Sequence, residues 1–201
     1  MPHPCTGVIL SGGLSTRFNG CNKALIDVGG TRVLDRLYAV FSELFDEIIL
    51  VTNDPLQFAA WDMMIVTDIF PARSSLTGIH AGLFYMKNQF AFFSACDTPF
   101  LKKDLVATLI EKIDRKQDII MPETTAGMEP LCAIYSKRCL STAAHHILQG
   151  KFKIQMALRR HRLKKIPESL LRKADPELIS FFNINTPADL AKAEMMAAQN
   201  A

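Results

Sequence analysis

The chain has 201 residues, of which 49% are hydrophobic and 21% are charged. This composition is that of an ordinary globular protein, which excludes wholesale disorder, and the length suits one well-filled domain spanning residues 1–201. The formal net charge of +3 is too small for the basic stripe of a nucleic-acid-binding protein, so no nucleic-acid partner is expected.

Short apolar runs alternate with segments of helical periodicity along the chain. The first half predicts a strand at 6–10, a helix at 31–45, strands at 47–51 and 64–67, a helix at 78–87 and a strand at 90–95. The second half predicts a helix at 102–113, strands at 119–121 and 131–135, a helix at 137–148, a strand at 180–184 and a helix at 187–198. Apolar strands that alternate with helices indicate an α/β fold with a mainly parallel sheet covered on both faces.

The last predicted helix has a clear start signal. Thr186 can cap it, Pro187 suits its first turn, and Asp189 follows three residues after the cap. A different segment, 151–165, holds seven Lys or Arg and no acidic residue. A solvated helix face is the simpler interpretation of this run, and binding of a substrate phosphate by one or two of its cations is the functional one.

The five cysteines argue for a reducing compartment, because their number is odd and no pair has Cys-x-x-Cys spacing. The first residues lack the basic and apolar regions of a secretory signal. No apolar run approaches the ~18 residues that a membrane span needs. We therefore expect a cytoplasmic protein with no membrane partner.

Glycines and two cations follow the first predicted strand, in the stretch LSGGLSTRFNGCNK, residues 10–23. In open α/β sheets, ligands bind where strands end at their carboxyl edge. The stretch has the spacing of neither a P-loop nor G-x-G-x-x-G. Its glycines could still let backbone N–H groups wrap an anion that Arg17 and Lys23 neutralise. A phosphate cradle and an ordinary glycine-rich turn with solvated cations are both consistent with this pattern.

Aspartates follow two further predicted strands. Asp97 comes directly after the apolar FAFFSAC, where a carboxylate is expected to be partly buried and to need a partner. Mg²⁺ takes one or two carboxylates and fills its other positions with water and phosphate oxygens, so Asp97 is the candidate metal ligand. The alternative is that Asp97 caps the following helix. Asp68 follows the strand at 64–67, and its alternative role is to begin a turn.

Four segments match a known family in the right order. They are the first loop at 10–23, Leu76-Thr77-Gly78, CDTPF at 96–100 and NINTPADL at 183–190. With these segments the chain resembles the nucleotidyltransferases with a Rossmann-like fold, and within them it is most similar to the molybdenum cofactor guanylyltransferases. Many nucleotidyltransferases share the first loop, whereas the CDTPF and NINTP pair is more specific to the molybdenum branch.

The resemblance implies a fold and a reaction. The fold would be a single-domain, Rossmann-like three-layer αβα architecture with a mainly parallel mixed sheet, of the nucleotide-diphospho-sugar transferase type. The reaction would transfer GMP from GTP to molybdenum-bound molybdopterin and release pyrophosphate, with Mg²⁺ as cofactor. GTP and molybdopterin would be the small-molecule partners, and molybdoenzymes or cofactor-delivery proteins are candidate protein partners. Such chemistry needs positioning and charge stabilisation and no protein nucleophile.

The resemblance also implies roles around the phosphates. Arg17 and Lys23 would hold the triphosphate, and Asp97 would bind Mg²⁺ and nucleotide; these three are the expected catalytic residues. Backbone contacts to the nucleotide would come from Leu10, Ser11, Gly12 and Gly13.

Further roles concern the nucleoside and the acceptor. Asp68 would contact the nucleoside, and Gly78 would shape the loop near the base. Asn183 and Asn185 would face the pterin, with Lys151 or Lys153 on its phosphate.

One departure from the family leaves the base open. Ser74-Ser75-Leu76-Thr77-Gly78 stands where the family has Gly-Pro-Leu-Ala-Gly. A molybdopterin cytidylyltransferase or a sugar-phosphate nucleotidyltransferase is therefore an alternative. So is a catalytically silent nucleotide-binding homologue, because a fold alone does not establish activity. The presence of Lys23 and Asp97 argues against the silent homologue.

Overall fold

The computed structural model describes residues 4–12 and 22–199, so that Gly13 and Arg17 lie outside the described residues. Within these residues, an eight-stranded sheet has the spatial order β10-β7-β9-β6-β1-β4-β5, with β8 paired to β7. Its strands are β1 (Cys5–Ser11), β4 (Ile48–Thr52), β5 (Met64–Val66), β6 (Phe90–Ala95), β7 (Ile119–Thr124), β8 (Gly127–Met128), β9 (Cys132–Ser136) and β10 (Leu163–Pro167). A separate antiparallel pair consists of β2 (Asp27–Val28) and β3 (Thr31–Arg32).

The sheet is mixed and mainly parallel, as predicted. β1 pairs in parallel with β4 and β6, β4 pairs in parallel with β5, and β7 pairs in parallel with β10. β9 runs antiparallel to β6 and β7, and β8 runs antiparallel to β7. All residues of the central β1 are buried, which explains its unbroken apolar sequence, since both faces of the strand are covered.

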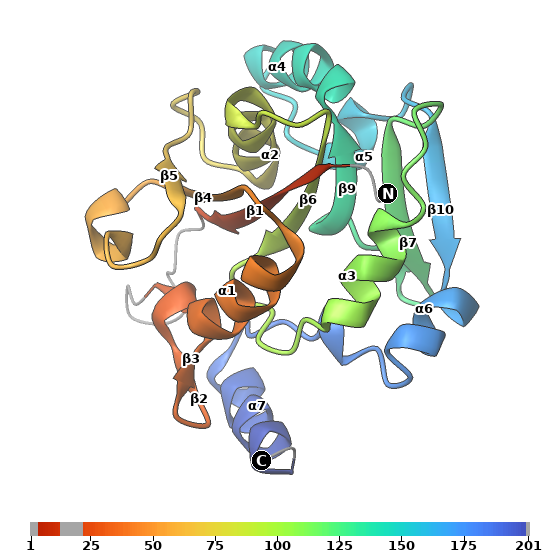
Figure 1. Cartoon of the computed structure of the whole chain (residues 1–201). Helices are drawn as coiled ribbons and strands as arrows, with labels where there is room; N and C mark the ends of the chain where they lie inside the picture. The colour runs from red at the N-terminus through yellow and green to blue at the C-terminus, as the bar shows by residue number, and fades with distance from the viewer. Residues whose placement is uncertain (1–3, 13–21, 200–201) are drawn as a thin grey trace.

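Helices form a layer on each face of the sheet (Figure 1), which confirms the predicted αβα architecture. One layer contains α1 (Val33–Leu44), α3 (Lys103–Ile110) and α6 (Glu168–Ala174); the other contains α2 (Ser75–Tyr85) and α4 (Leu140–Leu148). Two further helices are α5 (Ile154–Ala157) and α7 (Pro187–Gln199). Short 3-10 turns lie at Lys23–Leu25, Pro55–Phe58, Lys137–Cys139 and Ile179–Phe181.

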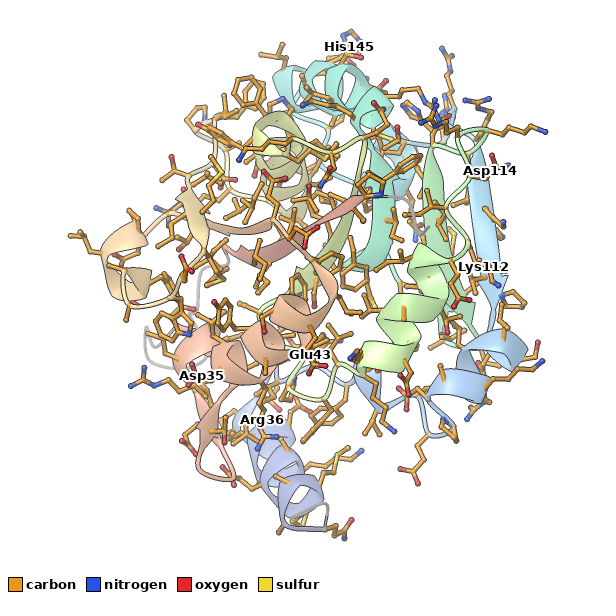
Figure 2. All side chains as sticks on the ribbon, viewed as in Figure 1. Asp35, Arg36, Glu43, Lys112, Asp114 and His145 are labelled. Atoms are coloured by element: carbon orange, nitrogen blue, oxygen red, sulfur yellow. The ribbon has the colours of Figure 1, made fainter. Side chains whose placement is uncertain are left out.

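Two glycines let helices from both layers press onto the central strands. A Cβ added at Gly7 of β1 would lie 2.5 Å from ring carbons of Phe41 and Phe45. A Cβ added at Gly82 of α2 would lie 2.6 Å from a ring carbon of Phe93. Side chains therefore interlock tightly between the layers, while polar residues such as the labelled Glu43 and His145 lie on the outside (Figure 2). Within the described residues, every helix falls short of the length and apolarity needed to span a membrane.

The strand predicted at 180–184 is wrong. The segment instead forms the 3-10 turn Ile179–Phe181, followed by backbone that joins no ladder. The Ser180 N–H donates to Asp175 Oδ2 at 2.8 Å, and the Lys102 N–H donates to Ser180 Oγ at 3.0 Å. Because Asp175 supplies the acceptor that a neighbouring strand would otherwise supply to the Ser180 N–H, the start of the apolar run packs as a turn, while Ser180 Oγ in turn satisfies the Lys102 backbone.

The interpretation of 151–165 as one solvated helix face is also wrong. Only Ile154–Ala157 is helical, and the end of the segment belongs to the unpredicted edge strand β10. Ile166 anchors β10 in the core at 1% exposure, while Lys165 Nζ lies 2.7 Å from Glu123 Oε1 on β7. Lysines are common on edge strands because they discourage pairing with another chain. α6, which follows β10, was not predicted either.

Candidate functional site

A cleft of about 320 Å³ opens at the carboxyl ends of β1, β4 and β6. It is lined by the end of β1 at 10–12, by the turn after β6 at 95–97 and by the start of α2 at 73–75. Asp68, Gly78 and Lys23 also line it. The strand-end argument therefore predicted the correct edge of the sheet for most of the candidate residues.

Three side chains that are far apart in the sequence meet beside this cleft. Lys23 Nζ lies 3.0 Å from Asp97 Oδ2 and 2.7 Å from Asn185 Oδ1. The side chains of Lys23 and Asp97 are 20% and 17% exposed. Because both charges are partly withdrawn from water, their attraction is stronger than that of an ordinary surface pair. The expected proximity of Lys23 and Asp97 is therefore present.

Backbone hydrogen bonds fix the turn that carries Asp97. The Cys96 N–H donates to the Leu10 carbonyl at 3.0 Å, and the Ile184 N–H donates to the Asp97 carbonyl at 2.9 Å. Asp97 does not cap the next helix, since α3 begins at Lys103 and its N-cap residue makes no side-chain cap bond. The carboxylate of Asp97 instead faces Lys23.

The turn that carries Lys23 is held by Asn22. The Asn22 side-chain oxygen accepts hydrogen bonds from the Ala24 N–H at 3.1 Å and from Ser11 Oγ at 3.2 Å. The first of these bonds begins the 3-10 turn Lys23–Leu25, and the second ties that turn to the end of β1. Lys23 is thus placed by the first strand as well as by its own partners. The sequence alone did not predict that Asn22 would hold the turn that carries Lys23.

Asp68 pairs with Asn53 on another side of the cleft. Asn53 Nδ2 donates to Asp68 Oδ2 at 2.9 Å, and a Cβ added at Gly12 would lie within 4.0 Å of both side chains. Burial raises the pKa of the Asp68 carboxyl, against the opposing effects of the Asn53 hydrogen bond and the charge of Arg73. Asp68 Oδ1 is buried and has no partner among the described residues. A buried acceptor without a donor is costly, so this oxygen is suited to a ligand donor.

Sequence reasoning assigned no role to Asn53. The residue follows directly after β4, at the same edge of the sheet as the other candidates. Its position at a strand end was the available signal, but its contact with Asp68 could not be read from the sequence.

Gly78 lies within α2, as the helix predicted at 78–87 requires, and not in the loop that the family resemblance implied. α2 begins at Ser75 because Ser74 and Thr77 cap it reciprocally. A Cβ added at Gly78 would lie 3.2 Å from Leu10 Cδ2, so glycine lets the helix approach the end of β1. The amino end of α2 and Arg73 both line the cleft, and both favour an anionic ligand there.

Other candidate residues do not join the cluster. The Asn183 side chain donates to the Phe181 carbonyl at 3.0 Å, within its own turn. Lys151 Nζ donates to Gln149 Oε1 at 2.8 Å, and neither Lys151 nor Lys153 lines the cleft. Cys96 does line the cleft, but burial raises the pKa of its thiol to about 12, so it is not a ready nucleophile.

The described residues contain no group of three or more His, Cys, Asp or Glu side chains that could enclose a metal ion. This does not conflict with Mg²⁺, which is commonly held by one or two carboxylates together with substrate phosphates and water. Asp97 offers one such carboxylate at the cleft. The donor set therefore fits an ion that arrives with a polyphosphate.

Comparison with known proteins gives consistent matches. Residues 7–166 match the MobA-like NTP transferase domain family. The chain is 45% identical over 189 residues to the molybdenum cofactor guanylyltransferase of Desulfosudis oleivorans, with 94% of each chain covered. It is 35% identical over 193 residues to the probable molybdenum cofactor guanylyltransferase of Natranaerobius thermophilus, again with 94% of each covered. Among solved structures, molybdopterin-guanine dinucleotide biosynthesis protein A from Archaeoglobus fulgidus has a TM-score of 0.86 at 30% identity, over 96% of this chain and 99% of that one.

Proposed function

The chain belongs to the MobA-like NTP transferase domain family, and from this premise we propose that it transfers GMP from GTP to molybdenum-bound molybdopterin. The observation on which the proposal rests is the meeting of Lys23 and Asp97 at the edge of a strand-end cleft. Similarity to chains named molybdenum cofactor guanylyltransferases extends over 94% of the length and supports the choice of base and acceptor.

The proposed reaction exchanges one phosphoanhydride bond for another. A phosphate oxygen of molybdopterin attacks the α-phosphorus of GTP and forms a new P–O bond. The bond from the α-phosphorus to the oxygen that bridges toward the β-phosphorus breaks, and pyrophosphate leaves with the electron pair. The protein supplies orientation and charge stabilisation and forms no covalent intermediate. The protonated thiol of Cys96 is consistent with this chemistry.

The phosphates of GTP would be bound at the end of β1. We propose that backbone N–H groups at 10–13 contact the nucleotide and that the Lys23 ammonium, together with Arg17, holds the triphosphate. Lys23 is preorganised for this part, because Asp97 and Asn185 already fix the position of its Nζ. A fixed cation contributes more to stabilising a developing charge than one that must first be ordered.

Asp97 would hold Mg²⁺ through its carboxylate. When bound, the ion would offset the negative charge of the triphosphate. Asp97 lies on a turn tied to both β1 and the C-terminal segment, so its carboxylate has little freedom to move away. These contacts support the assignment of Asp97 as the metal-binding residue.

The nucleoside and the pterin would lie on either side of the phosphates. Asp68 would contact the nucleoside through its unpartnered Oδ1, which suits a hydroxyl or amino donor. Gly78 would lie near the base, at the start of α2. Asn183 and Asn185 would face the pterin, with Lys151 or Lys153 on its phosphate.

We also propose that the whole chain is one nucleotidyltransferase domain. The family match ends at residue 166, yet residues beyond it bond to the site through Asn185 and Ile184. The buried, unpaired thiols of Cys5, Cys96, Cys132 and Cys139 suit a reducing compartment, which supports a cytoplasmic location.

A nucleotide panel tests the proposal. Thermal unfolding is measured with Mg²⁺ and each of GTP, CTP, ATP and UTP, since a ligand at a hundred times its Kd stabilises by about 2.7 kcal/mol. GTP should give the largest rise in Tm, and pyrophosphate release should require molybdenum-bound molybdopterin as well. A larger rise with CTP would identify a cytidylyltransferase, and release with a sugar phosphate would replace the acceptor. A rise in Tm with a nucleotide but no pyrophosphate release with any acceptor would leave the catalytically silent homologue, and no response to any nucleotide would refute the proposal.

A further inference from the structure

Asn185 holds the ammonium of Lys23 although the two residues are 162 positions apart. The distance from Lys23 Nζ to Asn185 Oδ1 is 2.7 Å, shorter than the 3.0 Å to Asp97 Oδ2. Asn185 lies beyond the segment that matches the family, which ends at residue 166. A side chain from the C-terminal part of the chain therefore contributes to the surroundings of the cation at the cleft.

The backbone on both sides of Asn185 is fixed. The Ile184 N–H donates to the Asp97 carbonyl at 2.9 Å, and Ile184 itself is fully buried. The Asn185 N–H donates to Asp189 Oδ2 at 3.0 Å, and Asp189 and Thr186 cap α7 reciprocally. The backbone at Asn185 is thus held by hydrogen bonds to the turn after β6 on one side and to the first turn of α7 on the other. Its side chain can orient Lys23 with little entropy cost, because its backbone position is already fixed.

A neutral acceptor has a specific consequence at this place. Asp97 supplies one negative charge to the Lys23 ammonium, and Asn185 supplies a hydrogen bond without a second charge. A second carboxylate would neutralise the cation further and repel a polyphosphate. The amide oxygen fixes the ammonium and leaves its charge available to an anionic ligand.

We propose that Asn185 is a positioning residue for Lys23: it holds the ammonium at the edge of the cleft, where the triphosphate binds. This inference rests on the proposed function and adds a residue to its triphosphate site. Asn185 acts through Lys23, so its contribution to triphosphate binding disappears when Lys23 is absent.

A double-mutant cycle tests this dependence. The Kd of GTP with Mg²⁺ is measured for the wild type, Asn185→Leu, Lys23→Met and the double variant, without the pterin. Loss of one hydrogen bond to a charged group should weaken binding by about tenfold in Asn185→Leu. In the Lys23→Met background the same change should have an effect below about twofold, because coupled residues are not additive. Equal effects of the change in both backgrounds, or an unchanged Kd of GTP in Asn185→Leu, would overturn the inference.

Matched measurements separate this inference from the proposed function. Lys192→Ala removes an exposed charge from α7 without touching Lys23, and it should keep the wild-type Kd.

If the wild type binds no GTP, the proposed function fails, and NMR of the free protein still tests the positioning. Asn185→Leu should move the Lys23 ¹³Cε signal toward that of a mobile lysine, and an unchanged signal would refute the positioning. Asn185→Ala replaces Asn185→Leu in both experiments if the leucine variant does not fold.

Discussion

At the scale of single residues, Lys23 serves as the counter-ion of Asp97, with Nζ 3.0 Å from Oδ2. A divalent cation that binds Asp97 must compete with this ammonium, since like charges repel. A triphosphate can bind the ammonium where Asn185 holds it and replace Asp97 as its counter-ion, which relieves that competition. Metal binding at Asp97 should therefore be weak without nucleotide and stronger with it.

Lys23→Met tests this competition. Without nucleotide, the variant should bind Mn²⁺ several-fold more tightly than the wild type, because the positive charge beside Asp97 is gone. Titration followed by electron paramagnetic resonance measures the free Mn²⁺. The added Asp97→Asn change should abolish the gain, which makes the double variant the control. Unchanged or weaker Mn²⁺ binding in Lys23→Met would show that the ammonium does not compete with the metal ion for the Asp97 carboxylate.

Asp97→Asn should separate turnover from folding. The amide keeps the size of the side chain but removes the charge proposed to hold Mg²⁺, so pyrophosphate release should fall by about 10²-fold or more. Stability should change by only about 1–2 kcal/mol, because the amide oxygen of the variant can still accept a hydrogen bond from Lys23 Nζ. Steady-state kinetics and urea unfolding measure the two quantities. Wild-type turnover in this variant would remove Asp97 from the mechanism.

The positions of individual candidate residues were predictable where they follow the end of a strand. Asp68 and Asp97 follow predicted strands, Lys23 ends the loop after the first predicted strand, and all three line the cleft. Asn185 was placed after a strand that does not form, yet it reaches the cluster because Ile184 bonds to the Asp97 backbone. The pairing of Asn53 with Asp68 was not predictable, since it depends on the approach of two loops.

At the scale of elements, Asp118 connects the starts of β7 and β10 with the turn that precedes α4. Its carboxylate accepts hydrogen bonds from Arg138 Nε and from the Arg162 backbone N–H and Nε. Burial alone would raise the pKa of Asp118, but hydrogen bonds from Arg162 and Arg138 outweigh burial and hold it well below its usual range. The carboxylate therefore stabilises the fold in its charged form.

Asp118→Ala should destabilise the protein by about 2 kcal/mol at pH 7, the scale of hydrogen bonds to a charged group. A group whose pKa is lower in the folded state stabilises fully above its unfolded value, near 3.8, and less as the pH falls toward its folded value. The difference from wild type should therefore shrink between pH 7 and pH 3 in urea unfolding. Exposed Glu111→Gln is the control. A difference that stays constant or grows toward acid would contradict this account.

Element types were predictable where periodicity was sustained. β1, β6 and α1 are long enough for their apolar patterns to identify them. β10 was missed because only Ile166 of its residues is buried, which leaves no period to detect. The run at 180–184 is apolar, but Asp175 accepts from the Ser180 N–H, and the 3-10 turn Ile179–Phe181 forms in place of a strand. Such side-chain competition cannot be inferred from periodicity.

At the scale of the whole molecule, the C-terminal segment returns to the first part of the chain. The Gly29 N–H donates to Glu194 Oε2 on α7 at 2.9 Å, while Asn185 reaches Lys23. α7, drawn in blue in Figure 1, lies against the β2–β3 pair. The alternation of strands and helices was enough to predict a sheet covered by helices on both faces. The return of the C-terminal segment to the first part of the chain was not predictable, because it depends on contacts between residues more than 160 positions apart.

Transfer of label from GTP tests the central claim most directly. Wild-type protein is incubated with Mg²⁺, molybdenum-bound molybdopterin and GTP labelled at either the α- or the γ-phosphate. The account predicts that the α-label enters a guanine dinucleotide of the pterin and that the γ-label leaves as pyrophosphate, with both lost in Asp97→Asn. If the α-label stays with free nucleotide, or if CTP donates its α-phosphate more readily than GTP, the chain is not a molybdenum cofactor guanylyltransferase.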